Sequence, residues 1–320
     1  MRNKTALILG ASGQDGSYLT SFLALKEYRV ICASRDADSN RFVNHTKLRI
    51  KGNVIYETIN INEIPTILRV IDKYKPEEIY NLAAQSSVGL SFEKPKETVE
   101  SIVFGTLNIL EAIRYSKQNT RFYNAGSSEA FGNQDAPINE LTNQEPVSPY
   151  GVSKAAAFDL VKNYRSAYSI FACTGILFNH ESPLRGPNFV TSKIIKTAVG
   201  IKKGLHENLV MGNLDISRDW GWAPEYVEAM WLMLQQDTPD DYIVATGQTH
   251  SLEEFTRYTF ECLNLDFFKY VTSEGSLFRP QDVRFNSADP TKAEKTLGWK
   301  AQCNMYSVID KLLDLELKKY

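Results

Sequence analysis

Tyr150 and Lys154 stand four positions apart, which places a phenol and an ammonium group on one face of a helix. A nearby lysine cation stabilises a phenolate and should lower the pKa of the tyrosine from about 10 toward neutrality. Such a tyrosine can take up a hydroxyl proton while the attached carbon loses hydride. The spacing alone is a weak signal, because the chain contains 16 tyrosines.

A carboxylate lies close to this pair in the expected fold. Ser127, Ser128 and Glu129 directly follow the predicted strand Arg121–Asn124 and the two small residues after it. A serine here would assist the tyrosine of a simple reductase. A carboxylate would face the carbon next to the one oxidised, whose C–H bond is acidified by a ketone, and a base there permits elimination of water. The plainer alternative is a glutamate at a helix end or on the surface.

A glycine-rich turn joins the first predicted strand, Ala6–Leu9, to a helix that begins near Ser17. Gly10, Gly13 and Gly16 permit a tight turn and a close approach of backbone to a pyrophosphate, and the helix N-terminus offers free N–H groups to the anion. This position between the first strand and the first helix predicts a dinucleotide site. The GxxGxxG spacing is typical of short-chain dehydrogenases/reductases.

Arg35 follows the second predicted strand, Val30–Ala33, where a guanidinium can pair with the 2′-phosphate of NADP. Arg35 therefore favours NADP, and NAD is the less favoured cofactor, although the neighbouring Asp36 is the residue type that binds the 2′-hydroxyl of NAD. Arg41 lies close behind, and a solvated surface arginine is the alternative interpretation of Arg35. Further positions expected at the cofactor are Asn60 and Ile61 at the adenine, and Leu82, Ala83 and Ala84 at the nicotinamide ribose.

Short apolar runs alternate with helical patterns in the first half of the chain. The predicted strands are Ala6–Leu9, Val30–Ala33, Val54–Tyr56, Glu78–Leu82, Arg121–Asn124 and Phe171–Phe178, and the helices include Ser17–Lys26, Glu63–Lys73 and Lys96–Tyr115. This rhythm predicts an α/β fold with a doubly wound parallel (Rossmann) sheet. A smaller, mostly C-terminal α/β domain should bind substrate. We expect a cofactor domain at 1–178 with returning segments near 213–248, and a substrate domain at 179–212 and 249–320.

The composition excludes several classes of protein. Lysine and arginine total 36 against 38 aspartates and glutamates, so a broad nucleic-acid-binding surface is not expected. No apolar run reaches the ~18 residues of a membrane span. The four cysteines, at 32, 173, 262 and 303, form no CxxC pair, which predicts buried thiols in a reducing cytoplasm and neither a metal site nor a disulfide framework.

These motifs and longer strings resemble the GDP-mannose 4,6-dehydratases of the extended short-chain dehydrogenase/reductase superfamily, over nearly the whole chain. The most specific strings are LFNHESP at 177–183, NFVT at 188–191, GNLD at 212–215, RDWG at 218–221, YVEAMWLMLQ at 226–235, ATG at 245–247 and FRP at 278–280. The resemblance implies a redox-neutral lyase that acts on a GDP-sugar. The carboxyl-terminal half, where most of these strings lie, would bind the nucleotide-sugar.

The resemblance also implies residue roles. Tyr150, tuned by Lys154, would take the proton of the sugar 4-hydroxyl while hydride passes from C4 to NADP. Glu129 would then remove the C5 proton and help water to leave from C6, after which hydride returns to C6 and gives a 4-keto-6-deoxy sugar. Ser127 stands where the family usually has threonine. The implied cofactor residues are Gly10, Gly13, Gln14, Asp15, Gly16, Arg35, Asn60, Ile61, Leu82, Ala83, Ala84, Tyr150, Lys154, Leu177, Asn179, His180 and Arg185. The implied substrate residues are Ser87, Ser128, Asn179, Glu181, Val190, Lys193, Gly212, Arg218, Arg279 and Asp282, of which Asn179, Lys193, Arg218 and Arg279 would hold the diphosphate.

Some positions depart from the family pattern. Leu184 and Ser192 replace arginines, and Ser87 occupies a position often held by histidine beside the sugar. Ala130 and Phe131 stand where Leu and Tyr usually follow the glutamate. These changes on the sugar side suggest either GDP-mannose or the longer GDP-manno-heptose as substrate. A GDP-sugar 4-reductase or epimerase, and a nucleotide-sensing protein that has kept the fold, are the alternatives.

Two expectations concern assembly and the cofactor loop. Family members pair through helices that correspond to 96–115 and 150–168, so the resemblance implies a homodimer or homotetramer. Phe158, Tyr164 and Tyr168 fit such an interface, although a stripe that faces the core explains them equally well. The family usually has two adjacent arginines and a Ser-rich loop after the second strand, and this chain has Arg35 and Asp36 with a shorter loop.

Overall fold

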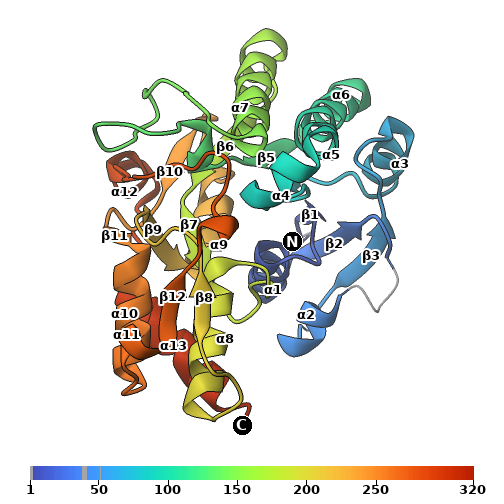
Figure 1. Ribbon diagram of the computed structural model, residues 1–320. Coiled ribbons are helices and arrows are strands. Elements are labelled where there is room, and N and C mark those ends of the chain that lie inside the picture. Colours follow the sequence, from blue (N-terminus) through green and yellow to red (C-terminus); the bar gives the residue numbers. More distant parts are fainter. Residues whose placement is uncertain (1–2, 38–41, 51) are drawn as a thin grey trace.

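A parallel sheet forms the centre of the molecule (Figure 1). The computed structural model describes residues 3–37, 42–50 and 52–320. Among these residues seven strands pair in the order β10-β6-β5-β4-β1-β2-β3, and every pair is parallel. The strands are β1 (Thr5–Leu9), β2 (Arg29–Ser34), β3 (Val54–Thr58), β4 (Glu78–Asn81), β5 (Arg121–Ala125), β6 (Ala172–Leu177) and β10 (Tyr242–Val244). The predicted doubly wound α/β fold is confirmed.

Helices cover both faces of this sheet. One face packs on α1 (Gln14–Leu25) and α9 (Ala223–Met233), and the other on α3 (Ile64–Tyr74), α6 (Gly105–Ser116) and α7 (Pro149–Tyr168). Strands buried on both faces need apolar residues at consecutive positions rather than at alternate ones. All five residues of β1 and all six of β6 are buried. The short apolar runs of the sequence therefore predict the sheet correctly.

The segment between β4 and α6 is more broken than the sequence suggests. The predicted helix at 96–115 is built from α5 (Pro95–Val99), a π-helical turn (Glu100–Phe104) and α6, preceded by the short α4 (Val88–Glu93). A Cβ on Gly105, the first residue of α6, would come 2.8 Å from Ile61 Cδ1, so glycine allows this helix to approach the segment that follows β3. The helix α2 (Val43–Lys47) was also not predicted.

The C-terminal part of the chain builds a second, smaller core. Strands β11, β9 and β7 form one small sheet and β12 pairs with β8, while helices α8, α10 and α13 pack around them. The bounds are β7 (Asn179–Glu181), α8 (Val190–Lys202), β8 (Leu209–Met211), β9 (Ser217–Trp222), β11 (Thr249–Ser251), α10 (Leu252–Cys262), α11 (Phe267–Tyr270), β12 (Val271–Ser273) and α13 (Met305–Leu317). Helix α12 (Thr291–Leu297) packs instead on α9 and β10, in the core of the large sheet. Between these segments the chain returns to the large sheet through α9 and β10, as Figure 1 shows.

Two expectations about side-chain exposure need correction. Cys262 is exposed, whereas Cys32, Cys173 and Cys303 are buried as expected. Tyr164 is buried, and its hydroxyl donates to Glu111 at 2.6 Å. Phe158 is partly buried. For these two residues the stripe that faces the core is the correct interpretation. Tyr168 is exposed. Among the described residues, no helix has both the length and the apolar composition needed to cross a membrane.

Candidate active site

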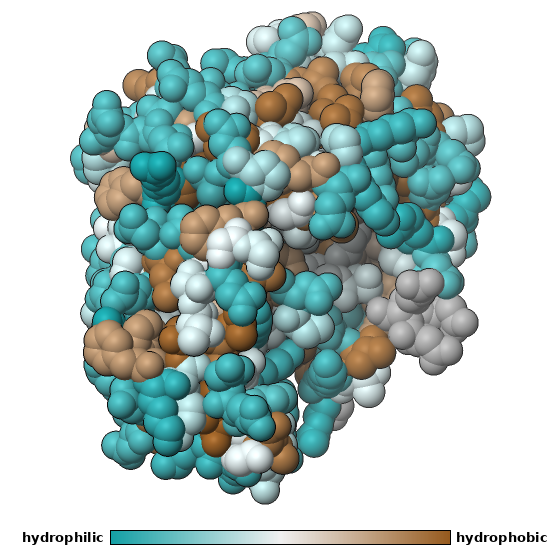
Figure 2. All heavy atoms as spheres, in the orientation of Figure 1, coloured by the Kyte–Doolittle hydropathy of each residue, from teal (hydrophilic) through white to brown (hydrophobic). Residues whose placement is uncertain are grey.

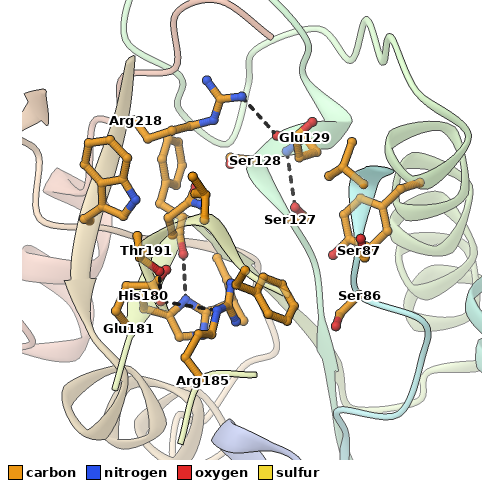
Figure 3. Close-up of a pocket in the computed structure, with 18 of the residues that line it drawn as sticks. Ser86, Ser87, Ser127, Ser128, Glu129, His180, Glu181, Arg185, Thr191 and Arg218 are labelled. Atoms are coloured by element: carbon orange, nitrogen blue, oxygen red, sulfur yellow. Dashed lines mark hydrogen bonds and ion pairs between the residues drawn. The ribbon is translucent and has the colours of Figure 1, made fainter. Parts of the chain in front are cut away.

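A cavity of about 450 Å³ opens at the C-terminal ends of the central strands, against the smaller core. Figure 3 shows Ser127, Ser128 and Glu129 at the end of β5 facing Arg218, with Ser86 and Ser87 along another wall. In parallel α/β sheets this edge is where ligands bind. Twenty of the expected site residues line it: Asp15, Leu82, Ala84, Ser87, Ser127, Ser128, Glu129, Tyr150, Lys154, Leu177, Asn179, His180, Glu181, Arg185, Val190, Lys193, Gly212, Arg218, Arg279 and Asp282.

The remaining expected residues lie outside the lining. Four of them lie in or beside the glycine turn: Gly10, Gly13, Gln14 and Gly16. Ala83 follows the neighbouring strand β4. The other three are Arg35, which follows β2, and Asn60 and Ile61, which follow β3. Arg35 is exposed just beyond β2, and Arg41 falls outside the described residues. Asn60 donates its amide to Glu63 at 2.7 Å, and Ile61 is 8% exposed within the core.

The glycine turn has the shape of a dinucleotide cradle. Gly10 has a φ of +79°, and a Cβ there would lie 2.6 Å from the Leu82 carbonyl oxygen. A Cβ on Gly16 would lie 2.3 Å from the Gly10 carbonyl oxygen. Any larger residue would therefore push the turn away from β4 and from the start of α1. The exposed N–H groups at the N-terminus of α1 fit the pyrophosphate of a nicotinamide dinucleotide.

Helix α7 brings Tyr150 and Lys154 to the cavity. Ser148 caps this helix by accepting a hydrogen bond from the Gly151 N–H at 3.0 Å, and the two side chains point from its first turns. A Cβ on Gly151 would lie 2.5 Å from the Glu129 carbonyl oxygen, so glycine allows the helix to contact the end of β5. This contact places the phenol and the Glu129 carboxyl group on neighbouring parts of one wall.

The ionisation of Tyr150 differs from the sequence-based expectation. Burial raises its pKa to about 12, while a hydrogen bond from Ser127 opposes that rise. The Nζ of Lys154 donates to the Ala125 carbonyl at 2.7 Å and lies 5.6 Å from the centroid of the phenol ring. Burial lowers the pKa of Lys154 to about 8, against the attraction of the Asp15 carboxylate. A large desolvation cost outweighs the charge effect that the spacing predicts.

Glu129 is a buried carboxyl group with a cationic neighbour. It is 9% exposed, and burial raises its pKa while Arg218 and Arg279 oppose the rise. Its Oε1 lies 3.6 Å from Arg218 Nη2. A buried carboxyl group with a raised pKa is suited to exchange protons with a substrate.

Three side chains predicted to bind substrate form a cluster beside Glu129. Asp282 Oδ1 accepts from Arg218 Nη2 at 3.0 Å and from Arg279 Nη1 at 3.1 Å. Arg218 is 4% exposed and also donates to the Val283 carbonyl at 2.7 Å. The near-neutral net charge of the whole chain gave no indication that two arginines meet here around one aspartate.

Lys193 lines the same cavity from α8, and its Nζ donates to the Val210 carbonyl at 2.6 Å. Glu181, expected to touch substrate, has two protein partners: it accepts from Thr191 Oγ1 at 2.7 Å, and its carboxylate lies 3.3 Å from Arg185 Nε. The guanidinium of Arg185 also stacks over the Phe189 ring.

Sixteen residues of the lining were not among the predicted site residues, and Gln85, Phe189 and Trp220 are three of them. Gln85 holds the loop before α4, because its amide donates to the Ser87 carbonyl at 2.8 Å and its oxygen accepts from the Ser87 N–H. Phe189 and Trp220 form apolar wall. Trp220 shares its face of β9 with Arg218, and the period of two along a strand could have indicated it. Among the described residues, no group of three His, Cys, Asp or Glu side chains could hold a metal ion.

The sequence matches a family model described as GDP-mannose 4,6 dehydratase over residues 7–312. It is 46% identical to GDP-mannose 4,6 dehydratase 2 of Arabidopsis thaliana, an alignment that covers 98% of this chain and 87% of the relative. It is 38% identical to the human GDP-mannose 4,6 dehydratase, with 98% of this chain and 92% of the relative covered.

Solved structures show a similar fold at lower sequence identity. UDP-glucose 4-epimerase of Thermotoga maritima, determined with UDP-glucose, superimposes with a TM-score of 0.86 and 22% identity, covering 98% of this chain and 99% of the epimerase. A dTDP-glucose 4,6-dehydratase of Bacillus anthracis in complex with NAD gives a TM-score of 0.84 and 18% identity, with 99% of this chain and 97% of that chain covered.

Proposed function

The chain belongs to the GDP-mannose 4,6-dehydratase family, and we propose that it removes water from a GDP-linked manno-sugar to give the 4-keto-6-deoxy sugar. The observation that carries the proposal is the buried Glu129 carboxyl group beside Tyr150 in one cavity. A reductase or an epimerase acting at C4 needs the tyrosine but has no use for a second base. The elimination of water requires one.

In the proposed reaction the Tyr150 phenolate, stabilised by the hydrogen bond from Ser127, takes the proton of the sugar 4-hydroxyl and becomes the phenol. Lys154 adds positive charge beside the same phenol, 5.6 Å from its ring centroid. Bound NADP supplies the acceptor for the hydride of C4 and later its donor to C6. Glu129 takes the C5 proton and passes it to the hydroxyl group that leaves C6 as water. When C6 has received hydride, the proton held by Tyr150 is returned to C5.

The diphosphate of the substrate would lie against Arg218, Arg279, Lys193 and Asn179. All four line the cavity, and a planar guanidinium suits the oxygens of a phosphate. Asp282 orients the two arginines by accepting from both. Asn179 lies at the start of β7, opposite Trp220 of β9.

We assign NADP rather than NAD as the cofactor. Arg35 is exposed at the end of β2, where a guanidinium can reach a 2′-phosphate. The glycine turn, Gln14, Asp15, Leu82, Ala83, Ala84, Tyr150, Lys154, Leu177, Asn179, His180 and Arg185 would surround the rest of the molecule. Asn60 and Ile61 are proposed at the adenine end.

The sugar is proposed to be mannose or the longer manno-heptose. Ser87 supports the longer sugar, because this small side chain lines the cavity. Leu184 and Ser192 give less support than their sequence positions suggested. Among the described residues, Leu184 is outside the cavity lining, and Ser192 faces a separate small pocket beside α13.

We further propose that the protein forms at least a dimer through α6 and α7. Phe104, Tyr115 and Tyr168 are 51%, 60% and 49% exposed there, and Figure 2 shows hydrophobic residues on the surface over these helices. Exposed apolar patches of this kind commonly mark protein interfaces. Sedimentation of the wild-type protein and of Tyr168→Glu should show a dimer that the substitution weakens; a monomeric wild type would overturn this assignment.

The dehydratase is tested with GDP-mannose, GDP-manno-heptose and a catalytic amount of NADP. The product should be lighter than the substrate by one water, with no net consumption of reduced cofactor. Glu129→Gln should bind NADP normally and lose turnover by about 10²–10⁴-fold. Glu93→Gln, which changes an exposed glutamate, serves as the control. A product of unchanged mass, or stoichiometric use of NADPH, would favour the epimerase or the reductase instead.

A further inference from the structure

A buried charged pair lies at the floor of the cavity. Asp15 is the second residue of α1, and its Oδ2 lies 3.0 Å from Nε2 of His180 on β7. His180 Nδ1 lies 2.7 Å from the Phe178 carbonyl oxygen. A carbonyl oxygen only accepts, so Nδ1 carries a proton, and an imidazole that also donates from Nε2 to a carboxylate is an imidazolium.

The electrostatics agree with this protonation state. Burial alone would raise the pKa of Asp15, but His180 and Gln14 lower it to about 2. Burial would lower the pKa of His180, yet the Asp15 carboxylate raises it above its ordinary value. The two shifts have the directions that a carboxylate–imidazolium pair requires.

Hydrogen bonds of neighbouring side chains also link α1 to β7 and to the residue that follows it. The Gln14 amide nitrogen donates to Asp15 Oδ1 at 3.0 Å and to the His180 carbonyl at 3.2 Å. Its oxygen accepts from Ser182 Oγ at 2.7 Å. With the Asp15–His180 pair, the contacts of Gln14 to the His180 carbonyl and to Ser182 make three that join the first turn of α1 to the segment that continues into the smaller core.

The imidazole ring is also fixed from its side. Tyr226 of α9 stacks on it with a centroid distance of 4.6 Å and an interplanar angle of 25°. Gly221 pairs with His180 across β7 and β9, and a Cβ on Gly221 would lie 2.4 Å from the Tyr226 ring. Glycine at this position is needed for the stack, so the backbone of β9 also holds the ring in place.

The Asp15 charge acts on the proposed catalytic side chains. The ionisable groups that face the pair are Lys154 and Tyr150 from α7, Arg185 after β7, Tyr18 from α1, Tyr123 from β5 and Tyr226 from α9. Burial lowers the pKa of Lys154 to about 8, and the Asp15 carboxylate opposes this fall. Asp15, His180 and Lys154 line the same cavity, so the carboxylate favours the charged form of the lysine there.

We propose that Asp15 and His180 are positioning residues of the reaction: the pair ties the glycine turn to β7 and holds a carboxylate in the cavity that Lys154 also lines, so that the lysine remains an ammonium group at the working pH. His180 acts by holding the carboxylate in its ionised form and in one place. This inference rests on the proposed function for its catalytic consequence, but the charged pair itself can be measured without substrate or cofactor.

The first measurement is a pH titration of the protein by NMR with ¹⁵N-labelled histidine. The chain has four histidines, and His180→Gln assigns the relevant signal by its disappearance. In the wild type, the His180 ring should stay an imidazolium to higher pH than an ordinary histidine. In Asp15→Asn it should titrate at lower pH, because the carboxylate no longer opposes the effect of burial. A neutral His180 ring at pH 6.5 in the wild type would overturn the proposal.

The second measurement is the pH dependence of kcat at saturating substrate and NADP. Asp15→Asn should move the alkaline limb of the profile to lower pH by about one unit, because Lys154 loses the carboxylate that favours its charged form. Activity at pH 8.5 should therefore fall more than activity at pH 6.5.

The matched control is Glu254→Gln, which removes the carboxylate of a second histidine pair, His250 Nδ1 to Glu254 Oε1 at 3.0 Å, on α10. It should leave the pH profile unchanged. A uniform loss of activity in Asp15→Asn at every pH, or weaker NADP binding with an unshifted profile, would reduce Asp15 to a structural or cofactor contact and overturn the proposal. If the wild type does not dehydrate GDP-sugars, the proposed function fails while the NMR titration still decides the state of the pair.

Discussion

Arg218 Nη2 lies 3.6 Å from Glu129 Oε1, a contact between the end of β5 in the large sheet and β9 in the small one. The guanidinium is fixed there, because it also donates to the Val283 and Ser217 carbonyls. Burial raises the pKa of Glu129, and Arg218 opposes this rise. The side chain proposed to hold the diphosphate therefore also controls the ionisation of the proposed base.

Arg218→Gln should make dehydration more sensitive to acid. Without the guanidinium the pKa of Glu129 rises further, and a base must be deprotonated before it can act. The acidic limb of kcat, measured at saturating GDP-mannose, should move to higher pH, so activity at pH 6 falls more than activity at pH 8. Arg279→Gln, at a more exposed arginine, should give a smaller shift in the same direction. Profiles that superimpose on the wild type in both variants would contradict this coupling.

The parts of this site that follow from local sequence were predictable. The glycine turn and the Tyr150–Lys154 spacing each depend on contacts within one or two turns of helix, so residue types at short spacing suffice. The sheet was predictable because strands buried on both faces need consecutive apolar residues, as β1 and β6 show.

Contacts between distant segments were not predictable from residue patterns. The Asp15–His180 pair joins α1 to β7, and no pattern of residues near either position predicts it. The ionisation of Tyr150 was misjudged for the same reason: the spacing shows the nearby lysine, but burial by segments far away in sequence raises the phenol pKa to about 12. The sequence fitted Tyr164 equally well to an interface and to a stripe that faces the core. The fold shows that it is buried, with its hydroxyl 2.6 Å from Glu111.

Gly16→Ala should weaken NADP binding and lower stability. The added Cβ would lie 2.3 Å from the Gly10 carbonyl oxygen and 2.6 Å from Ala11 Cα, so the turn must shift. Overpacking of this kind costs about 1–3 kcal/mol, to be measured by denaturant unfolding. Gly275→Ala is the control, because nothing lies within 4 Å of its Cβ position and its φ is not positive. Equal stability and equal NADP affinity in the two variants would show that the turn is not a close-packed cradle.

Arg35→Ala should weaken NADP binding while NAD binding stays the same. A hydrogen bond to a charged group contributes about 1.5–3 kcal/mol, so the dissociation constant for NADP should rise by about ten- to hundredfold. NAD lacks the 2′-phosphate and serves as the internal control in the same titration. Equal losses for both cofactors would place Arg35 away from the phosphate.

Ser87→His should discriminate between the two candidate sugars. Ser87 lines the cavity, and its Oγ caps α4 by accepting from the Leu90 N–H at 3.2 Å. An imidazole would occupy space that a longer exocyclic chain needs, so kcat/KM for GDP-manno-heptose should fall at least about tenfold more than kcat/KM for GDP-mannose.

The cap must be separated from the steric effect. Loss of an N-cap costs about 1 kcal/mol of stability, which should affect both substrates alike. Ser87→Asn keeps a capping oxygen in a smaller side chain than histidine, so it should retain the stability of α4 and show a weaker preference. If Ser87→His lowers the two kcat/KM values by the same factor, Ser87 acts through the helix cap and does not select the length of the sugar.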